Sequence, residues 1–299
     1  PYTALVAELM LQQTRVEAVK ERYVQFLEAF PTPEVLAAAS EEEVLKLWEG
    51  LGYYSRARNL HKAAKVIAEH GFPQTFEGVR ALPGVGDYTA GAVCSIALGL
   101  PAPAVDGNVL RVLSRLYADD SNIDDAATKP AYAVLLRKVY PAGTADFCEA
   151  LMELGAIVCV PNGAPLCGEC PWKTLCRAHL SGMEDAYPVR KEKKARRIVE
   201  ATVCVLKCGE KYALEKRPEK GLLAGLWQFP FFEGDVPDFD KPIAEKHAKH
   251  IFTHVEWRMT GKRIDVCEEL PPYTWVTAQE LREKYAVPSA FKAFLPWIK

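Results

Sequence analysis

Four cysteines crowd into one short stretch of this chain. They stand at Cys159, Cys167, Cys170 and Cys176, with the spacing C-x7-C-x2-C-x5-C, among nine cysteines in all. Thiolates are soft ligands, and four of them suit an iron–sulfur cluster or zinc. Zinc sites more often use two separated C-x2-C pairs. A single pair flanked by two lone cysteines therefore favours an iron–sulfur cluster wrapped by one loop, with zinc as the alternative.

Two acidic residues are candidates for chemistry. Glu8 lies among Leu5, Leu9 and other apolar residues of a helical pattern. A buried carboxyl in such a place is costly unless it is paired or functional. Asp106 precedes a helical pattern, where an aspartate commonly serves as the N-cap. In isolation the N-cap is the better interpretation of Asp106, whereas Glu8 needs a partner or a function.

A glycine-rich turn, Leu82-Pro83-Gly84-Val85-Gly86, lies between two helical patterns. Its glycines let the backbone turn tightly and approach another molecule closely. The N–H groups that open the following helix, near Asp87, suit a phosphate. An ordinary turn between two helices is an equally good interpretation of this motif alone.

The elements that position these residues change character along the chain. Apolar residues at helical spacing, separated by turns rich in Gly and Pro, predict helices within 3–30, 40–48, 56–70, 87–99, 107–117, 128–138 and 144–158. Ser40 and Glu43 have the spacing of a capping box that would open the second of these helices. Alternating patterns predict strands at 199–206, 212–216, 255–259, 263–266 and 273–276, followed by helices at 278–284 and 289–297. The first two strands are expected to pair as a hairpin around Cys208, Gly209 and Glu210. We therefore expect a helical domain over 1–180, a basic linker over 181–197 and an α/β domain over 198–299.

Charge and hydropathy limit the possible functions. The chain has 299 residues and a net charge of −2, so DNA binding must rest on local geometry instead of an overall basic character. One local excess exists, either a solvated linker or a contact surface, at Arg190, Lys191, Lys193, Lys194, Arg196 and Arg197. No apolar run reaches the ~18–20 residues of a membrane span, and no signal-peptide pattern opens the chain. These features predict a cytoplasmic protein without membrane contact.

Several motifs together resemble the MutY-type adenine DNA glycosylases, which belong to the helix-hairpin-helix superfamily that also contains endonuclease III. In the expected order, they are Glu8 to Thr14, Gly50 to Leu60, the glycine turn, Val105 to Val109 and the cysteine loop 159–176. A Nudix-like C-terminal domain is indicated by Glu215 to Pro218, Gly225 to Pro230 and Phe252 to His254. The resemblance implies an all-α helix-hairpin-helix module with a 4Fe-4S cluster loop, followed by a smaller α/β Nudix-like domain.

The resemblance also implies a reaction, the hydrolysis of the N-glycosidic bond of adenine mispaired with 8-oxoguanine or guanine in double-stranded DNA. The adenine is flipped into a pocket, where Glu8 protonates it and Asp106 stabilises the sugar cation. Glu8 then needs a raised pKa, and Asp106 must stay ionised. Tyr88 would line the pocket, and Asn108 would support Asp106.

Position 88 separates two branches of this superfamily. Enzymes resembling endonuclease III carry a lysine there, and only an amine can form the imine of a lyase reaction. Tyr88 therefore predicts a monofunctional glycosylase. We separately expect the protein to be a monomer. Two rival hypotheses are a lyase that acts on oxidised pyrimidines and a lesion sensor without excision activity.

The resemblance assigns DNA contacts as well. Tyr53 resembles a wedge beside 8-oxoguanine, and Gln13 and Thr14 would line the gap left by the flipped base. Leu82, Gly84, Val85 and Gly86 would approach the backbone, and Thr253 and His254 would read 8-oxoguanine. No glutamate-rich Nudix box follows Pro230, so nucleotide hydrolysis is not expected.

This sequence departs from the MutY-type pattern in four features. Thr253 stands where serine is usual, Cys148 stands where asparagine is frequent, and the first cysteine gap is one residue longer than in many relatives. Family members also carry a further segment before the residue that matches Pro1, so we expect an N-terminally truncated chain. The resemblance further predicts association with the bacterial nucleoid.

Overall fold

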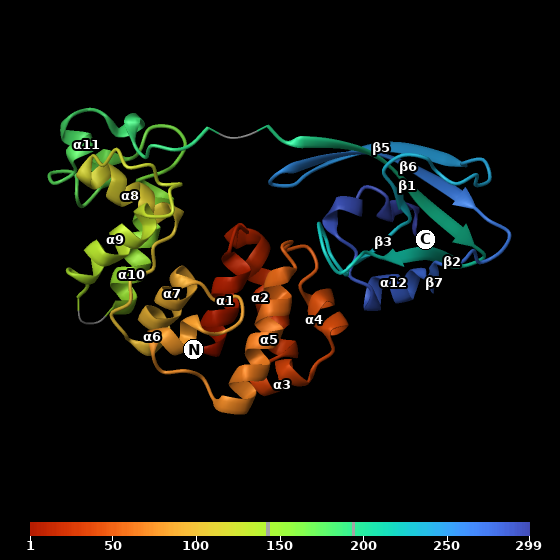
Figure 1. Ribbon diagram of the computed structural model, residues 1–299, viewed down its shortest axis with the longest axis horizontal. Helices are drawn as coiled ribbons and strands as arrows, with labels where there is room; N and C mark the ends of the chain where they lie inside the picture. Colours follow the sequence, from red (N-terminus) through yellow and green to blue (C-terminus); the bar gives the residue numbers. More distant parts are fainter. Residues whose placement is uncertain (142–143, 193–194) are drawn as a thin grey trace. The chain divides into compact units, whose positions relative to one another are not determined.

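The computed structural model describes residues 1–141, 144–192 and 195–299. The chain forms two compact units. Unit 1 comprises Pro1–Gln12, Thr32–Ala37 and Lys62–Lys193, and unit 2 comprises Gln13–Pro31, Ala38–His61 and Lys194–Lys299. Unit 1 is helical, whereas unit 2 combines helices with a mixed sheet (Figure 1). The predicted multi-domain fold is confirmed, and the boundaries 1–180, 181–197 and 198–299 stay a prediction.

Unit 1 consists of short helices around α7. They are α1 (Tyr2–Leu11), α3 (Pro33–Ala38), α6 (Phe76–Arg80), α7 (Asp87–Leu98), α8 (Gly107–Tyr117), α9 (Thr128–Arg137), α10 (Thr144–Glu153) and α11 (Arg177–Leu180), with single turns η1 (Leu154–Val158), η2 (Cys167–Glu169) and η3 (Glu184–Ala186). Helices α1, α6 and α10 each pack against α7. A Cβ on Gly91 would overlap the carbonyl oxygen of Pro103, so only glycine lets the segment before α8 lie against α7.

Helix α1 is apolar on nearly every side. Leu5, Val6, Leu9 and Met10 are each at most 1% exposed. A helix that is hydrophobic all round must be buried, because any exposed face would leave apolar surface in water. Its position against α7 therefore carries Glu8 into the interior of unit 1.

Residues 3–30, whose pattern predicted a helix, form two helices, because Gln13 between them has a left-handed backbone conformation with φ +55°. Unit 2 thus contains α2 (Val16–Ala29), α4 (Glu41–Leu47), the first part of α5 (Ser55–His70) and α12 (Ala278–Lys284).

The capping box expected from Ser40 and Glu43 is confirmed. The Glu43 backbone N–H donates to Ser40 Oγ at 3.2 Å, and the Ser40 N–H donates to Glu43 Oε2 at 2.8 Å.

The sheet of unit 2 has the order β3-β2-β1-β6-β5, with β4 paired to β1 and β7 paired to β2. Its strands are β1 (Arg197–Cys208), β2 (Lys211–Lys216), β3 (Trp227–Gln228), β4 (Phe231–Phe232), β5 (Ala244–Ile251), β6 (Val255–Asp265) and β7 (Thr274–Thr277). Strands β1 and β6 are parallel, whereas the other pairs are antiparallel. An apolar core that includes Trp257, Phe291 and Phe294 holds the sheet to the C-terminal segment.

The predicted hairpin of 199–206 and 212–216 is confirmed as β1 and β2. Three details of the prediction were wrong. The strands expected at 255–259 and 263–266 are one strand, β6, and β5 was missed because its exposed residues are mostly charged or histidine. The helix expected over 289–297 is two single turns, η4 (Ser289–Phe291) and η5 (Leu295–Trp297), since Pro296 lacks the N–H that a continuous helix needs. Among the described residues, no helix has the length and apolarity of a membrane span.

Candidate active site

Glu8 is a buried carboxyl on α1. Its side chain is 8% exposed, and its Oε2 atom has no hydrogen-bond partner among the residues that the structure describes. Burial raises the pKa of Glu8, the nearby Asp106 and Glu149 raise it further, and a hydrogen bond with Tyr88 opposes them. A carboxyl in such surroundings favours its protonated form and can donate a proton.

Tyr88 stands beside Glu8 in the first turn of α7. Its hydroxyl hydrogen-bonds to Glu8 and also contacts Met152 Sδ on α10, at 3.5 Å. Burial raises the pKa of Tyr88, as do Glu8 and Asp106. The phenol is therefore neutral, and it joins α1 and α10 through polar contacts.

Asp106 is held at the N-terminus of α8. Its Oδ1 accepts from the Val109 backbone N–H at 2.7 Å, and its Oδ2 accepts from Asn108 Nδ2 at 2.9 Å. The N-cap interpretation is thus correct, and the same carboxyl also acts electrostatically on Glu8 and Tyr88. The structure therefore brings together Glu8, Tyr88, Asp106 and Asn108, the four residues predicted to be catalytic.

Arg111 links this carboxyl site to the cysteine loop. Its guanidinium donates to Asn108 Oδ1 at 2.9 Å, to the carbonyl of Gly155 at 2.6 Å and to the carbonyl of Cys159 at 2.7 Å. This connection was not predicted from the sequence. Arg111 is only 4% exposed, and nothing in the residue pattern of α8 distinguishes a buried arginine from an exposed one.

Three other residues of the site were not predicted. Glu149 and Met152 are three residues apart on α10 and therefore lie on the same face of the helix. If one of them is known to face the site, the other is expected there too. Lys129 lies on α9, and its ammonium faces the Tyr88 ring. No signal in the sequence marks Lys129.

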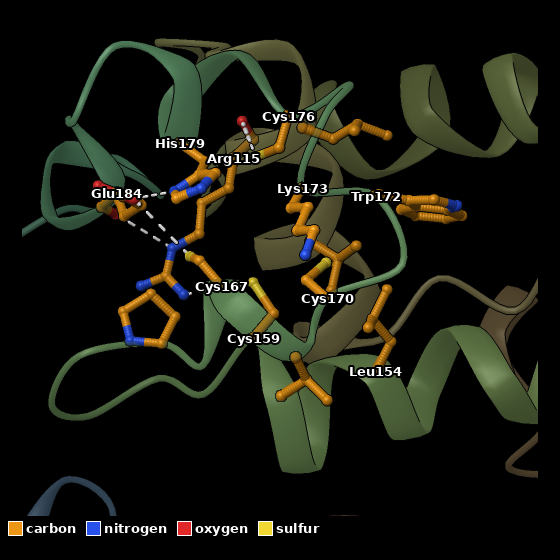
Figure 2. A pocket seen from close by; sticks show the side chains of 14 residues that line it. Arg115, Leu154, Cys159, Cys167, Cys170, Trp172, Lys173, Cys176, His179 and Glu184 are labelled. Carbon is orange, nitrogen blue, oxygen red and sulfur yellow. Dashed lines mark hydrogen bonds and ion pairs between the residues drawn. The ribbon is translucent and has the colours of Figure 1, made fainter.

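The four predicted cysteine ligands line a single cavity of unit 1 (Figure 2). Arg115 donates to Cys159 Sγ at 3.3 Å, while the Cys176 thiol donates to the Arg115 carbonyl at 3.3 Å. The Cys167 thiol lies 3.7 Å from Glu184 Oε1, which also pairs with His179 Nδ1 at 2.7 Å. Four soft thiol donors around one space fit an iron–sulfur cluster, whereas Cys167, His179 and Glu184 form a mixed set closer to a zinc site.

The glycine turn exposes its backbone at both glycines and buries its two aliphatic side chains. Leu82 is 4% exposed and Val85 is 8% exposed, so both side chains belong to the core. Gly84 has φ +77°, and a Cβ on Gly86 would meet no atom within 4 Å. Gly84 and Gly86 are exposed and have no side chains, so the backbone of this turn is accessible, as expected for phosphate binding.

The other predicted DNA contacts lie in unit 2, around a cavity of about 1060 Å³ that is lined by Gln13, Tyr53, Thr253 and His254. Tyr53 is 46% exposed, and its hydroxyl hydrogen-bonds to Thr253 Oγ1 at 2.8 Å. Thr14 is not among the lining residues, but its Oγ1 accepts from Arg56 at 3.0 Å, and Arg56 also lies over the Tyr53 ring.

Part of the basic stretch borders the same cavity. Arg196 and Arg197 line it, and Arg196 donates to the carbonyl of Phe252 at 3.2 Å. Lys191 instead pairs with Asp125 at 2.8 Å. Lys193 and Lys194 lie outside the described residues. The described basic residues of this stretch are all exposed, and its two ends contact different segments of the chain.

Comparison with known proteins identifies the family. A model of the HhH-GPD superfamily of base excision DNA repair proteins matches residues 6–139, and a NUDIX domain model matches residues 201–297. The chain is 34% identical to the adenine DNA glycosylase of Homo sapiens, over 97% of this chain and 67% of that protein. It is 38% identical to that of Rattus norvegicus, over 97% and 70%. The chain belongs to the adenine DNA glycosylase family.

Other relatives agree with this family. An adenine DNA glycosylase of Buchnera aphidicola is 32% identical over 85% of this chain and 77% of that protein, whereas the chain spans only 42% of the relative from Arabidopsis thaliana. A solved thermostable thymine-DNA glycosylase is 30% identical with a TM-score of 0.55, over 60% of this chain and 85% of that chain. An endonuclease III in complex with DNA is 29% identical with a TM-score of 0.52, over 60% and 84%.

Membership in the adenine DNA glycosylase family confirms the predicted enzyme class, an adenine-specific DNA N-glycosylase of base excision repair. The helical part is a helix-hairpin-helix glycosylase fold, and the sheet belongs to a Nudix-like domain.

Proposed function

We propose that this chain removes adenine from mispairs with 8-oxoguanine or guanine, as a monofunctional glycosylase that acts as a monomer. One observation carries the proposal: Glu8 and Asp106 share a site but differ in their surroundings. Glu8 is buried with one oxygen unpartnered, whereas both Asp106 oxygens accept hydrogen bonds. Two carboxyls with unlike environments suit the separate roles of proton donor and charge stabiliser.

In this proposal Glu8 delivers its proton to N7 of the flipped adenine, so that the base departs neutral. Asp106, held by Asn108 and the Val109 N–H, stabilises the positive charge that develops on the sugar. Water then completes the hydrolysis. Tyr88 walls the base pocket, and because a phenol cannot form an imine, the DNA strand is not cut by lyase chemistry.

The cavity of unit 2 would recognise 8-oxoguanine. Tyr53 supplies an exposed aromatic face, while Thr253, His254 and Gln13 supply polar groups beside it. Thr14 does not line this cavity and would act indirectly, by accepting the hydrogen bond that helps to orient Arg56. The backbone of Leu82, Gly84, Val85 and Gly86 would hold a phosphate. Arg196 and Arg197 add positive charge where a DNA backbone would pass.

We also propose a 4Fe-4S cluster held by Cys159, Cys167, Cys170 and Cys176. Support comes from the four soft donors lining one cavity and from the cationic Arg115 beside Cys159. When bound, the cluster would cross-link the loop through four iron–thiolate bonds. Lys173 of this loop and the adjacent Arg177 would then contact DNA phosphates. The protein would act at the nucleoid in the cytoplasm.

A cleavage assay tests the proposed reaction. Duplexes that contain 8-oxoguanine opposite adenine are incubated with the protein and then treated with hot alkali. Strand scission at adenine only after alkali is expected, and a duplex with 8-oxoguanine opposite cytosine should stay intact. Scission before alkali would indicate a lyase, and binding without scission would indicate a lesion sensor. The Glu8→Gln variant should bind the duplex but lose excision by about 10²–10⁴-fold.

A further inference from the structure

Arg217 is a half-buried arginine at the cavity of unit 2, and the chemistry proposed above gives it no role. It directly follows β2, and its side chain lines the cavity that Thr253 and His254 also line. We propose that Arg217 is a preorganised contact for a phosphate of the DNA strand that carries 8-oxoguanine. The contact rests on the proposed function, in which this cavity recognises that base.

The guanidinium of Arg217 is held in place by the protein. Its Nε donates to the carbonyl of Leu222 at 2.9 Å, and its Nη1 donates to Gln228 Oε1 at 2.7 Å. Gln228 is only 3% exposed and is itself fixed, because its Nε2 donates to Glu215 Oε1 at 2.6 Å. The same Glu215 oxygen accepts from the Phe231 backbone N–H at 3.1 Å. The fold therefore sets the orientation of the guanidinium before any ligand binds.

Two aromatic rings lie beside the same guanidinium. The Cζ atom of Arg217 is 5.4 Å from the centre of the Trp257 ring and 5.7 Å from the centre of the Phe231 ring. The two rings contact each other, with their centres 4.6 Å apart. Cation–π contacts of this kind are favourable and restrict the side chain further. An arginine restricted in this way loses little conformational entropy when it binds a ligand.

The protein contacts of Arg217 leave its charge without an anionic partner. Both of its hydrogen-bond acceptors are neutral, since one is a carbonyl and the other an amide. Among residues 1–141, 144–192 and 195–299, no carboxylate forms an ion pair with Arg217, and its Nη2 donates no hydrogen bond. Burial lowers the pKa of Arg217, while Glu215 and Glu233 raise it. A bound anion would give Nη2 an acceptor and would offset the cost of partly burying the charge.

The surroundings favour a phosphate as this anion. Within 195–299, the residues that line the cavity include three arginines, Arg196, Arg197 and Arg217, but one acidic residue, Glu233. Guanidinium groups bind phosphate through charge-assisted hydrogen bonds. A stacked base would need an open aromatic face, whereas the Trp257 ring beside Arg217 is only 2% exposed. The DNA backbone is the source of phosphate that fits the proposed function, and a free nucleotide offers the same chemistry.

The salt dependence of binding tests this contact. The full-length chain is titrated with a duplex that holds 8-oxoguanine opposite a non-cleavable 2′-fluoro adenosine, between about 50 and 200 mM salt. Loss of one phosphate contact reduces the slope of log K against log salt by about 0.9. We expect Arg217→Met to show this reduction and to bind about fivefold to tenfold more weakly near 0.1 M salt. Arg217→Lys keeps the charge and should retain most of the slope.

Arg258→Met is the matched control. Arg258 is exposed, lies next to Trp257 on β6 and is not among the residues that line the cavity. Its substitution changes the net charge by the same amount and should leave the slope unchanged. Thermal unfolding shows whether each variant folds, and Arg217→Gln, which retains an N–H donor without the charge, gives the same comparison if Arg217→Met does not fold.

Three results would overturn the proposal. A parental slope in Arg217→Met would exclude the phosphate contact. A lost preference for 8-oxoguanine over guanine, with the slope unchanged, would make Arg217 a base-reading residue. Binding of deoxyguanosine 5′-monophosphate that disappears in Arg217→Met, again with the duplex slope unchanged, would indicate a site for free nucleotides. All of these are binding measurements. A parent that excises no adenine but shows the expected change of slope would therefore reject the proposed function and retain the contact.

Discussion

The Tyr88 hydroxyl and the Glu8 carboxyl are hydrogen-bonded in the interior of unit 1. Burial is the larger influence on Glu8 and raises its pKa, while the bond from Tyr88 favours the ionised carboxylate and lowers it. The net direction is upward. Tyr88 therefore keeps the pKa of Glu8 below the value that burial alone would give, in addition to any contact that it makes with the base.

Removal of the Tyr88 hydroxyl should change the pH dependence of excision. In Tyr88→Phe the hydrogen bond that stabilises the carboxylate is lost, so the pKa of Glu8 rises further. Since the proton donor is the protonated form, the basic limb of the single-turnover rate should move to higher pH. Single-turnover excision measured from about pH 6 to pH 9 checks this shift. A basic limb that moves to lower pH would contradict it.

Glu8 should also make the stability of the protein depend on pH. Its folded-state pKa is raised, so its contribution is fully present below the unfolded-state pKa of about 4.3 and is lost as pH rises through the folded value. Glu8→Gln cannot ionise and should be more stable than the parent at pH 8, by about 1–3 kcal/mol, with a smaller difference at pH 5. Urea unfolding at both pH values measures this, and equal differences would count against a raised pKa.

The hydrogen bond between Tyr53 and Thr253 should couple two segments of unit 2. Both side chains are accessible, so a double-mutant cycle of Tyr53→Phe and Thr253→Val should give a coupling of about 0.5–1 kcal/mol in urea unfolding. Thr253→Ser keeps the hydroxyl and serves as the control. Strictly additive effects would show that the bond does not contribute in solution.

Gly155 should be sensitive to a single methyl group. A Cβ there would lie 2.5 Å from the Cβ of Asn108, which holds Asp106. Gly155→Ala should therefore cost about 1–3 kcal/mol and slow excision, because Asn108 must move. The exposed Gly168, where a Cβ would meet nothing within 4 Å, provides the control Gly168→Ala. Parental rates in both variants would exclude Asn108 as a support of Asp106.

Metal analysis should distinguish iron–sulfur from zinc in the cysteine loop. The protein should contain about four iron atoms and matching sulfide, with the visible absorbance of a cluster, and Cys170→Ser should lose both. The exposed Cys267 lies outside the loop, so Cys267→Ser should retain them. Stoichiometric zinc, lost instead in His179→Ala, would favour the mixed site of Cys167, His179 and Glu184.

Prediction from sequence succeeded where the signal was local. The capping box of Ser40 and Glu43 and the β1–β2 hairpin depend on neighbours in the chain, and both are confirmed. It was wrong at β5, whose side chains alternate little in polarity, and at residues 289–297, where Pro296 divides the helix. It missed Lys129 because that residue acts across the fold on Tyr88 and has no motif of its own.

The order of residues along the chain already supplies the reactive groups: four thiols in one loop, an acid in an apolar helix, an aspartate before a helix, and a phenol where a lyase needs an amine. Which of these groups meet depends on how the helices and strands pack. Burial of α1 against α7 brings Glu8 to Tyr88, and the fold of unit 2 joins Tyr53 to Thr253 across 200 residues of chain. The reason is physical, since local spacing sets backbone conformation, whereas the protonation of a carboxyl depends on burial and on charges that only packing brings near.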